Sequence, residues 1–125
     1  MNRGILFVAV GGLIGCVARY LIAIAVSRQV SSTFPFGTMG INIAGCFLIG
    51  IFYALAEKGN ILTPEWRLFL TTGFCGGFTT FSTYSYESMN LMRDGQWLYL
   101  CIYVFGSNII GLGGTFLGMT IIKSL

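Results

Sequence analysis

The amino-acid sequence predicts an all-α membrane protein that forms a single domain, residues 1–125, of four transmembrane helices. The first observation behind this prediction is composition: 55% of the 125 residues are hydrophobic, only 9% are charged, and the mean hydropathy is +0.82. A soluble domain carries roughly 25% charged residues, because its surface faces water. So few charges cannot cover a water-soluble globule, and we therefore expect the chain to lie in a lipid bilayer.

The second observation is that four apolar stretches are long enough for a membrane helix, which needs about 20 residues. The predicted helices cover residues 4–26, 36–56, 68–92 and 97–122. Charged residues gather between these stretches: Arg28, Glu57, Lys58, Glu65, Arg67, Arg93 and Asp94. We interpret the first stretch as a retained helix rather than a signal peptide, because its apolar run exceeds the roughly 7–15 residues of such a peptide.

The positive charges leave the orientation of the chain in the membrane open. Lys and Arg favour the cytoplasmic side of a bilayer. With four crossings, one side carries Arg3, Lys58, Arg67 and Lys123, and the other side carries Arg28 and Arg93. This bias is small. It fits an ordinary protein with both termini inside, and it also fits a chain that inserts both ways and pairs with an oppositely oriented copy.

Several classes of protein are excluded by composition. The seven basic residues are scattered, so we expect no nucleic-acid partner. One cysteine lies in each apolar stretch, without C-x-x-C spacing and without any histidine, which argues against a zinc site or a redox pair. No pattern of catalytic residues is present, so we expect a protein that is not an enzyme.

The third stretch contains the most informative local sequence. Gly73, Gly76 and Gly77 come just before the pair Thr79 and Thr80, and such residues are poor helix formers. We expect the third helix to be broken near mid-membrane, where a non-helical backbone is tolerated only inside protein or along a cavity. The released carbonyls would suit a hard cation such as sodium. The alternative is a continuous helix whose glycines serve a tight helix crossing.

Polar and aromatic residues at membrane depth are candidates for an ion path, because polar groups are costly there without partners. Amide N–H groups and the electropositive edges of aromatic rings both favour an anion. The candidates are Thr38 and Asn42, which share a helix face, the stripe Thr79, Thr83 and Glu87, the rings of Phe78 and Phe81, and Tyr103 with Ser107. For each residue, hydrogen bonding between helices or simple packing is the alternative role. Arg19 is either structurally paired or draws anions towards a vestibule.

Three motifs resemble the Fluc, or CrcB, family of fluoride channels across essentially the whole chain. They are Gly-Gly-x-x-Gly-x-x-x-Arg-Tyr at residues 11–20, Gly-Thr-x-x-x-Asn at 37–42, and Gly-Phe-Cys-Gly-Gly-Phe-Thr-Thr-Phe-Ser-Thr at 73–83. The resemblance implies an antiparallel, dual-topology homodimer in the bacterial plasma (inner) membrane, where the chain is multi-pass. It also implies two pores along the subunit interface, through which fluoride leaves the cell passively, conferring fluoride resistance.

The resemblance also implies roles for individual residues. A structural sodium ion (Na+) would lie at the dimer centre, held by main-chain carbonyls of Gly76 and Thr79 from both subunits. Arg19 would lie near an aqueous vestibule. The fluoride path would follow Asn42, Phe81, Ser82, Thr83, Tyr84, Glu87, Tyr103 and Ser107. Tyr84 departs from the family pattern, which has phenylalanine there, so it offers either a ring edge alone or an additional hydroxyl donor.

Two other functions remain as alternatives. A small multidrug-type, proton-coupled exporter has a similar architecture, but members of that family are recognised by a carboxylate in the first helix. Here the only charge within that helix is Arg19. A non-transporting assembly subunit would leave the broken helix and its hydroxyl stripe unexplained.

Overall fold

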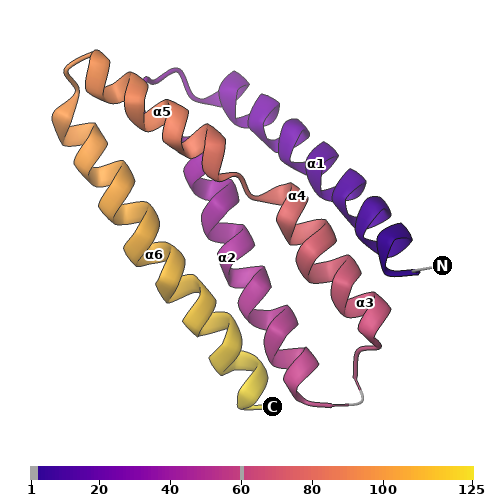
Figure 1. The fold of residues 1–125 in the computed structure, drawn as a ribbon. Coiled ribbons are helices and arrows are strands. Elements are labelled where there is room, and N and C mark those ends of the chain that lie inside the picture. Colours follow the sequence, from indigo (N-terminus) through magenta and orange to yellow (C-terminus); the bar gives the residue numbers. More distant parts are fainter. Residues whose placement is uncertain (1–2, 60) are drawn as a thin grey trace.

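A computed structural model describes residues 3–59 and 61–125, and all regular secondary structure in that part of the chain is helical (Figure 1). The elements are α1 (Arg3–Gln29), α2 (Phe36–Glu57), α3 (Pro64–Leu68), the π-helical segment η1 (Phe69–Cys75), α4 (Gly76–Phe78), α5 (Phe81–Arg93) and α6 (Trp97–Lys123). They lie side by side in one bundle, with the start of α1 and the end of α6 at the same end. The predicted all-α fold is confirmed.

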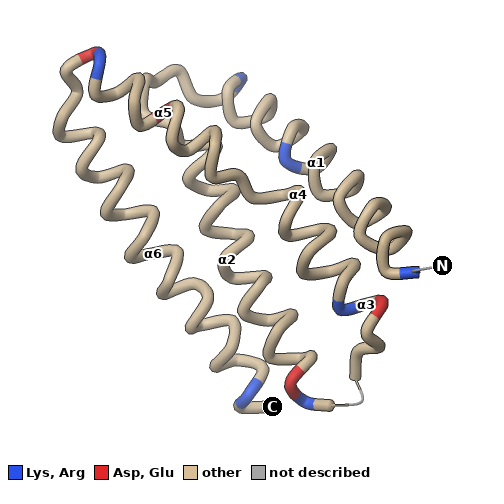
Figure 2. The backbone as a smooth tube through the Cα atoms, viewed as in Figure 1, with Lys and Arg blue, Asp and Glu red and all other residues tan. Residues whose placement is uncertain are grey.

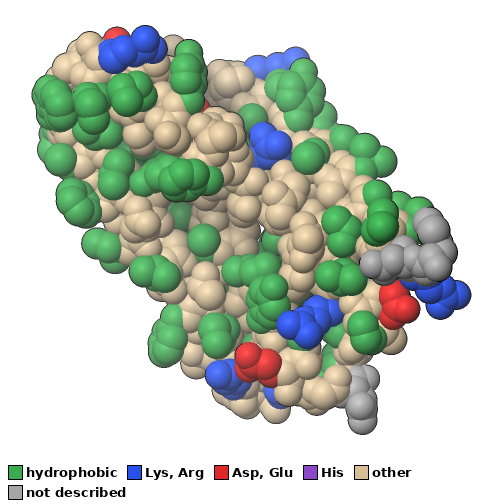
Figure 3. Space-filling model, viewed as in Figure 1, with side chains coloured by type: hydrophobic (Ala, Val, Ile, Leu, Met, Phe, Trp, Pro, Cys, Tyr) green, Lys and Arg blue, Asp and Glu red, His purple; other side chains and the backbone are tan. Residues whose placement is uncertain are grey.

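Three helices of the described chain, α1, α2 and α6, are long and apolar enough to cross a membrane. They coincide with the first, second and fourth predicted stretches. Figure 2 shows most of the charged residues near the two ends of the bundle. Figure 3 shows apolar side chains spread over the face in view. The exposed apolar side chains of the molecule include Leu13, Phe105, Leu112 and Phe116. An exposed apolar surface of this extent matches a lipid environment rather than water.

The third predicted stretch, residues 68–92, does not form one continuous helix. The chain instead runs through α3, η1, α4 and α5. Between α4 and α5, Thr79 and Thr80 adopt extended backbone conformations, with φ/ψ of −89°/160° and −150°/121°. Because Thr79 lies outside α5, it does not continue the helical stripe of Thr83 and Glu87, and this part of the expected pattern was wrong.

Glycines allow two pairs of helices to approach backbone to backbone. Helix α1 packs on η1 and α4, and a Cβ placed on Gly77 would lie 2.6 Å from the Gly12 carbonyl oxygen. A Cβ on Gly15 would overlap the Phe74 carbonyl. Helix α2 packs on α6 in the same way, with Gly50 against the Thr115 carbonyl. Small residues at such crossings bring helices close enough for dense packing in a membrane.

The substitution Gly15→Ala tests this packing. We expect it to destabilise the fold by about 1–3 kcal/mol, because the added methyl group must push α1 away from η1 and α4. The measurement is the temperature at which the detergent-solubilised protein loses its monodisperse gel-filtration peak. Gly113→Ala on α6 is the matched control, because a Cβ there meets nothing within 4 Å. Equal loss of stability in both variants would contradict the packing argument.

Candidate functional site

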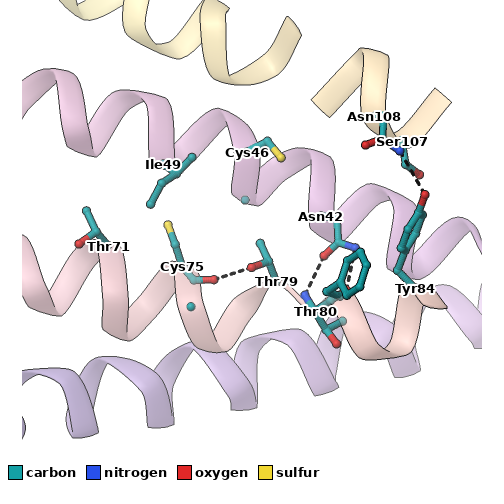
Figure 4. A pocket seen from close by; sticks show the side chains of 13 residues that line it. Asn42, Cys46, Ile49, Thr71, Cys75, Thr79, Thr80, Tyr84, Ser107 and Asn108 are labelled. Carbon is teal, nitrogen blue, oxygen red and sulfur yellow. Dashed lines mark hydrogen bonds between the residues drawn. The ribbon is translucent and has the colours of Figure 1, made fainter. Parts of the chain in front are cut away.

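A groove of about 410 Å³ lies where α2, the α4–α5 connection and α6 meet (Figure 4). Its lining mixes hydrogen-bonding groups, aromatic rings and small residues: Asn42, Gly45, Cys46, Ile49, Thr71, Cys75, Gly76, Thr79, Thr80, Phe81, Tyr84, Ser107 and Asn108. We call this feature the polar groove. The polar side chains gather around the interruption between α4 and α5, while Ile49 and Thr71 lie towards the opposite end.

Asn42 from α2 holds the interruption through two hydrogen bonds with one residue. Its Nδ2 donates to the Thr80 carbonyl oxygen at 3.1 Å, and the Thr80 backbone N–H donates to Asn42 Oδ1 at 2.9 Å. A buried backbone needs a partner for each N–H and C=O group, and here one side chain serves both groups. The amide nitrogen carries two hydrogens, so one of them remains beyond the bond to Thr80.

The same interruption releases two carbonyl groups. In a continuous helix the Thr80 N–H would donate to the Gly76 carbonyl, but it donates to Asn42 instead. The Thr83 N–H, which would serve the Thr79 carbonyl, donates to the Thr80 side-chain oxygen at 3.2 Å. Within the part of the chain that the structure describes, neither carbonyl receives a hydrogen bond. Unpaired carbonyl oxygens of this kind are ligands that hard cations accept.

Arg19 from α1 lies at the end of α4. Its Nε donates to the Gly77 carbonyl oxygen at 3.0 Å, and the side chain is half-buried. A cation is favourable at the carboxyl end of a helix, where carbonyls lack helical donors. Arg19 therefore has the structural pairing that was one of its two expected roles. It does not line the polar groove, and its place in a vestibule stays a prediction.

A row of aromatic rings leads away from the groove along α5 and α6. The Phe81 ring, 78% exposed, lies 5.7 Å from the Tyr84 ring, which lies 5.1 Å from the ring of Tyr103. Tyr103 is fully buried, and its hydroxyl donates to Glu87 Oε1 at 3.0 Å. Thr38 from α2 lies beside the same hydroxyl. The hydroxyl hydrogen of Tyr103 is therefore already donated within the chain.

The structure brings some of the expected site residues into one groove and places others elsewhere. Those that line the groove are Asn42, Gly76, Thr79, Phe81, Tyr84 and Ser107. Those that lie outside it are Arg19, Thr38, Phe78, Ser82, Thr83, Glu87 and Tyr103. Phe78 is 5% exposed and stacks on Phe74 with ring centroids 5.4 Å apart, so it lies in the interior of the helix bundle.

Seven residues of the groove were not predicted to belong to the site, and Thr80 and Asn108 are two of them. Thr80 caps α5, and its position three residues before Thr83, after a run of glycines, is a readable capping signal. Asn108 donates from Nδ2 to the Tyr84 hydroxyl oxygen at 3.2 Å. No local sequence pattern predicts the pairing of Asn108 with Tyr84, because the two residues are far apart in sequence and meet only when α5 packs on α6.

Helices that are apolar on their outer surface, together with an interrupted segment that lines a polar groove, define a multi-pass helical membrane protein with a polar site inside. The chain matches the family model described as "CrcB-like protein, Camphor Resistance (CrcB)" over residues 6–119, and it therefore belongs to that family. The family resemblance seen in the three motifs is confirmed.

Curated relatives align over nearly the whole chain. The "Fluoride-specific ion channel FluC" of Chlorobaculum tepidum is 51% identical over 121 residues, which cover 97% of this chain and 95% of the relative. The protein with the same name from Chlorobium phaeobacteroides is 47% identical over 119 residues, covering 95% and 92%. That from Flavobacterium psychrophilum is 43% identical over 123 residues, covering 98% and 99%. These relatives are named as ion channels rather than as enzymes.

The bonds of Asn42 predict the effect of removing its side chain. We expect Asn42→Ala to destabilise the fold by about 1–3 kcal/mol, because the part-buried Thr80 N–H and C=O lose the hydrogen bonds that Asn42 makes with them. The measurement is the same melting temperature in detergent, read by gel filtration. Asn90→Ala near the end of α5 is the control, because the side-chain hydrogen bond that Asn90 makes within the described residues is with the exposed Arg93. A loss of stability no larger than that of the control would contradict the role of Asn42.

Proposed function

We propose that the chain is a passive, fluoride-selective channel that exports fluoride from the cytoplasm and confers fluoride resistance. The observation that carries this proposal is the alignment with fluoride-specific channels over nearly the full length of both partners, at 51% identity in one case. The aligned region includes each of the three motifs and every element that lines the polar groove. A small multidrug-type exporter is not favoured, because α1 contains no Asp or Glu, and Arg19 in its middle donates a hydrogen bond to the Gly77 carbonyl.

The chemistry of the polar groove supports an anion of this size. Fluoride is small and strongly hydrated, so a pore must replace its water with close donors and positive ring edges. The groove offers the second amide hydrogen of Asn42, the exposed ring of Phe81 and the hydroxyl of Ser107. The Ser107 oxygen is buried and has no hydrogen-bond partner among the described residues. A buried donor without a partner costs about 1–3 kcal/mol, which an anion in the groove would offset.

We place the fluoride path along the groove and onward over α5. It begins at Asn42, passes the rings of Phe81 and Tyr84 and the hydroxyl of Ser107, and continues past Ser82 and Thr83 to Glu87, Tyr103 and Thr38. Phe78 is buried against Phe74 in the interior of the helix bundle, so the proposed path does not contact its ring. Several weak sites in series let an ion bind and still leave, as conduction requires.

The functional unit is an antiparallel, dual-topology homodimer in the bacterial plasma membrane. In one subunit Phe81 is 78% exposed, so a second copy is needed to enclose the path. The elements from α3 to α5 together make the third of four crossings, with Thr79 and Thr80 at mid-membrane. The small bias of positive charge between the two sides permits insertion in both orientations.

The released carbonyls of Gly76 and Thr79 fit a sodium ion held between the two subunits. Both oxygens lack donors within the described residues and belong to the same groove. Sodium binds oxygen ligands, and its charge would offset two sets of carbonyl dipoles that otherwise face each other. The ion would thereby link the two interrupted helices and act as a structural part of the dimer.

Liposomes loaded with potassium fluoride or potassium chloride test the proposed function. Valinomycin releases potassium, and ion-selective electrodes follow the anion. We expect rapid loss of fluoride with chloride retained. Phe81→Ile should slow fluoride loss by about tenfold, which corresponds to about 1.4 kcal/mol of lost interaction with the ring.

The matched control is Phe105→Ile, which removes another exposed ring, on α6 and outside the groove. This variant should conduct as the unmodified protein does. Absence of fluoride loss from folded protein, or loss of chloride at the same rate, would sink the proposal.

A further inference from the structure

Tyr84 is a groove residue at which the chain departs from the pattern of the family that it resembles. Its hydroxyl is reached from the neighbouring helix α6 by Asn108 (Figure 4). Asn108 Nδ2 donates to the Tyr84 oxygen at 3.2 Å and to the Val104 carbonyl oxygen at 2.8 Å. Because a carbonyl oxygen only accepts hydrogen bonds, the atom that contacts Val104 must be the amide nitrogen. The orientation of the amide is therefore fixed.

This arrangement determines which hydrogen bonds the Tyr84 hydroxyl can still form. A phenolic hydroxyl has one hydrogen to donate and lone pairs that accept. Asn108 occupies an accepting position of Tyr84, so the hydroxyl hydrogen needs a different acceptor. Among the described residues none receives it. Tyr103 is the internal comparison, because its hydrogen is donated to Glu87 within the subunit.

The unused hydrogen of Tyr84 lies in a groove that already contains an unpaired donor. The Ser107 side-chain oxygen is buried, lines the same groove, and lacks a partner within the described ranges. Ser107 and Asn108 are consecutive on α6, so the donor and the residue that orients Tyr84 come from one turn of helix. Two hydroxyl groups whose hydrogens have no acceptor among the described residues form, in one groove, a site for a small anion that accepts hydrogen bonds strongly.

We propose that the Tyr84 hydroxyl is a direct ligand of the transported anion and that Asn108 is the positioning residue that directs its hydrogen into the groove. This inference rests on the proposed function, because it assigns a further ligand to the same path. A ring in this position without a hydroxyl supplies only its weakly positive edge. The hydroxyl adds a hydrogen bond to a charged partner, which strengthens the binding of fluoride most, because its charge density is the highest among the halides.

The test is the dependence of fluoride efflux on fluoride concentration in liposomes that contain the full-length protein. Tyr84→Phe should raise the half-saturating fluoride concentration by about tenfold, the scale of one hydrogen bond to a charged group, with a smaller change in maximal rate. Asn108→Leu, of similar shape, should produce the same shift although it leaves the tyrosine in place. The double variant should be no weaker than Tyr84→Phe alone, because both changes remove one interaction.

Tyr86→Phe is the matched control, since it removes the same hydroxyl from the same helix, at a side chain that is 64% exposed and outside the groove. Its half-saturating concentration should equal that of the unmodified protein. An unchanged value for Tyr84→Phe, in protein that still elutes as a dimer and conducts, would overturn the inference alone. Additive effects of Tyr84→Phe and Asn108→Leu would overturn the positioning role. An unmodified protein that passes no fluoride would overturn the proposed function and this inference with it.

Discussion

The pair of hydrogen bonds between the Asn42 amide and the Thr80 peptide group is the interaction on which the site depends. In hydrocarbon no water satisfies a broken helix, so an interruption persists only when protein groups replace the missing bonds. Asn42 supplies a donor and an acceptor to a single extended residue. This pairing fixes where α4 ends and α5 begins relative to α2, and the positions of Phe81 and Tyr84 follow from it.

Other elements then complete the interruption and separate two kinds of polar surface. Arg19 binds the Gly77 carbonyl from α1, and the Thr80 side chain caps the first turn of α5. The carbonyls of Gly76 and Thr79 are left without donors, and the amino end of α5 lies beside them. One interruption thus presents carbonyl oxygens suited to a cation next to a helix end suited to an anion. Such a division would let the proposed sodium ion and the proposed fluoride path use the same region without competing for ligands.

Much of the fold could be predicted, because long apolar runs in a chain with few charges have only one stable solution in a bilayer. The site was harder, because helical periodicity does not continue through an extended segment. Phe78 and Phe81 were both expected to line the ion path, yet Thr79 and Thr80 redirect the chain between them. Phe78 consequently lies in the interior and Phe81 faces outward. The pairing of Asn108 with Tyr84 depends on how α5 packs on α6, which no local pattern encodes.

Tyr84 and Tyr103 show why residue type alone does not assign a role along such a path. Their rings lie 5.1 Å apart, and both carry a hydroxyl. Tyr103 donates its hydroxyl hydrogen to Glu87, so this hydroxyl stabilises the packing of α5 on α6. The oxygen of Tyr84 accepts from Asn108, so its hydrogen is still to be donated. A hydroxyl can donate a hydrogen bond to an anion only if no neighbouring group already accepts its single hydrogen.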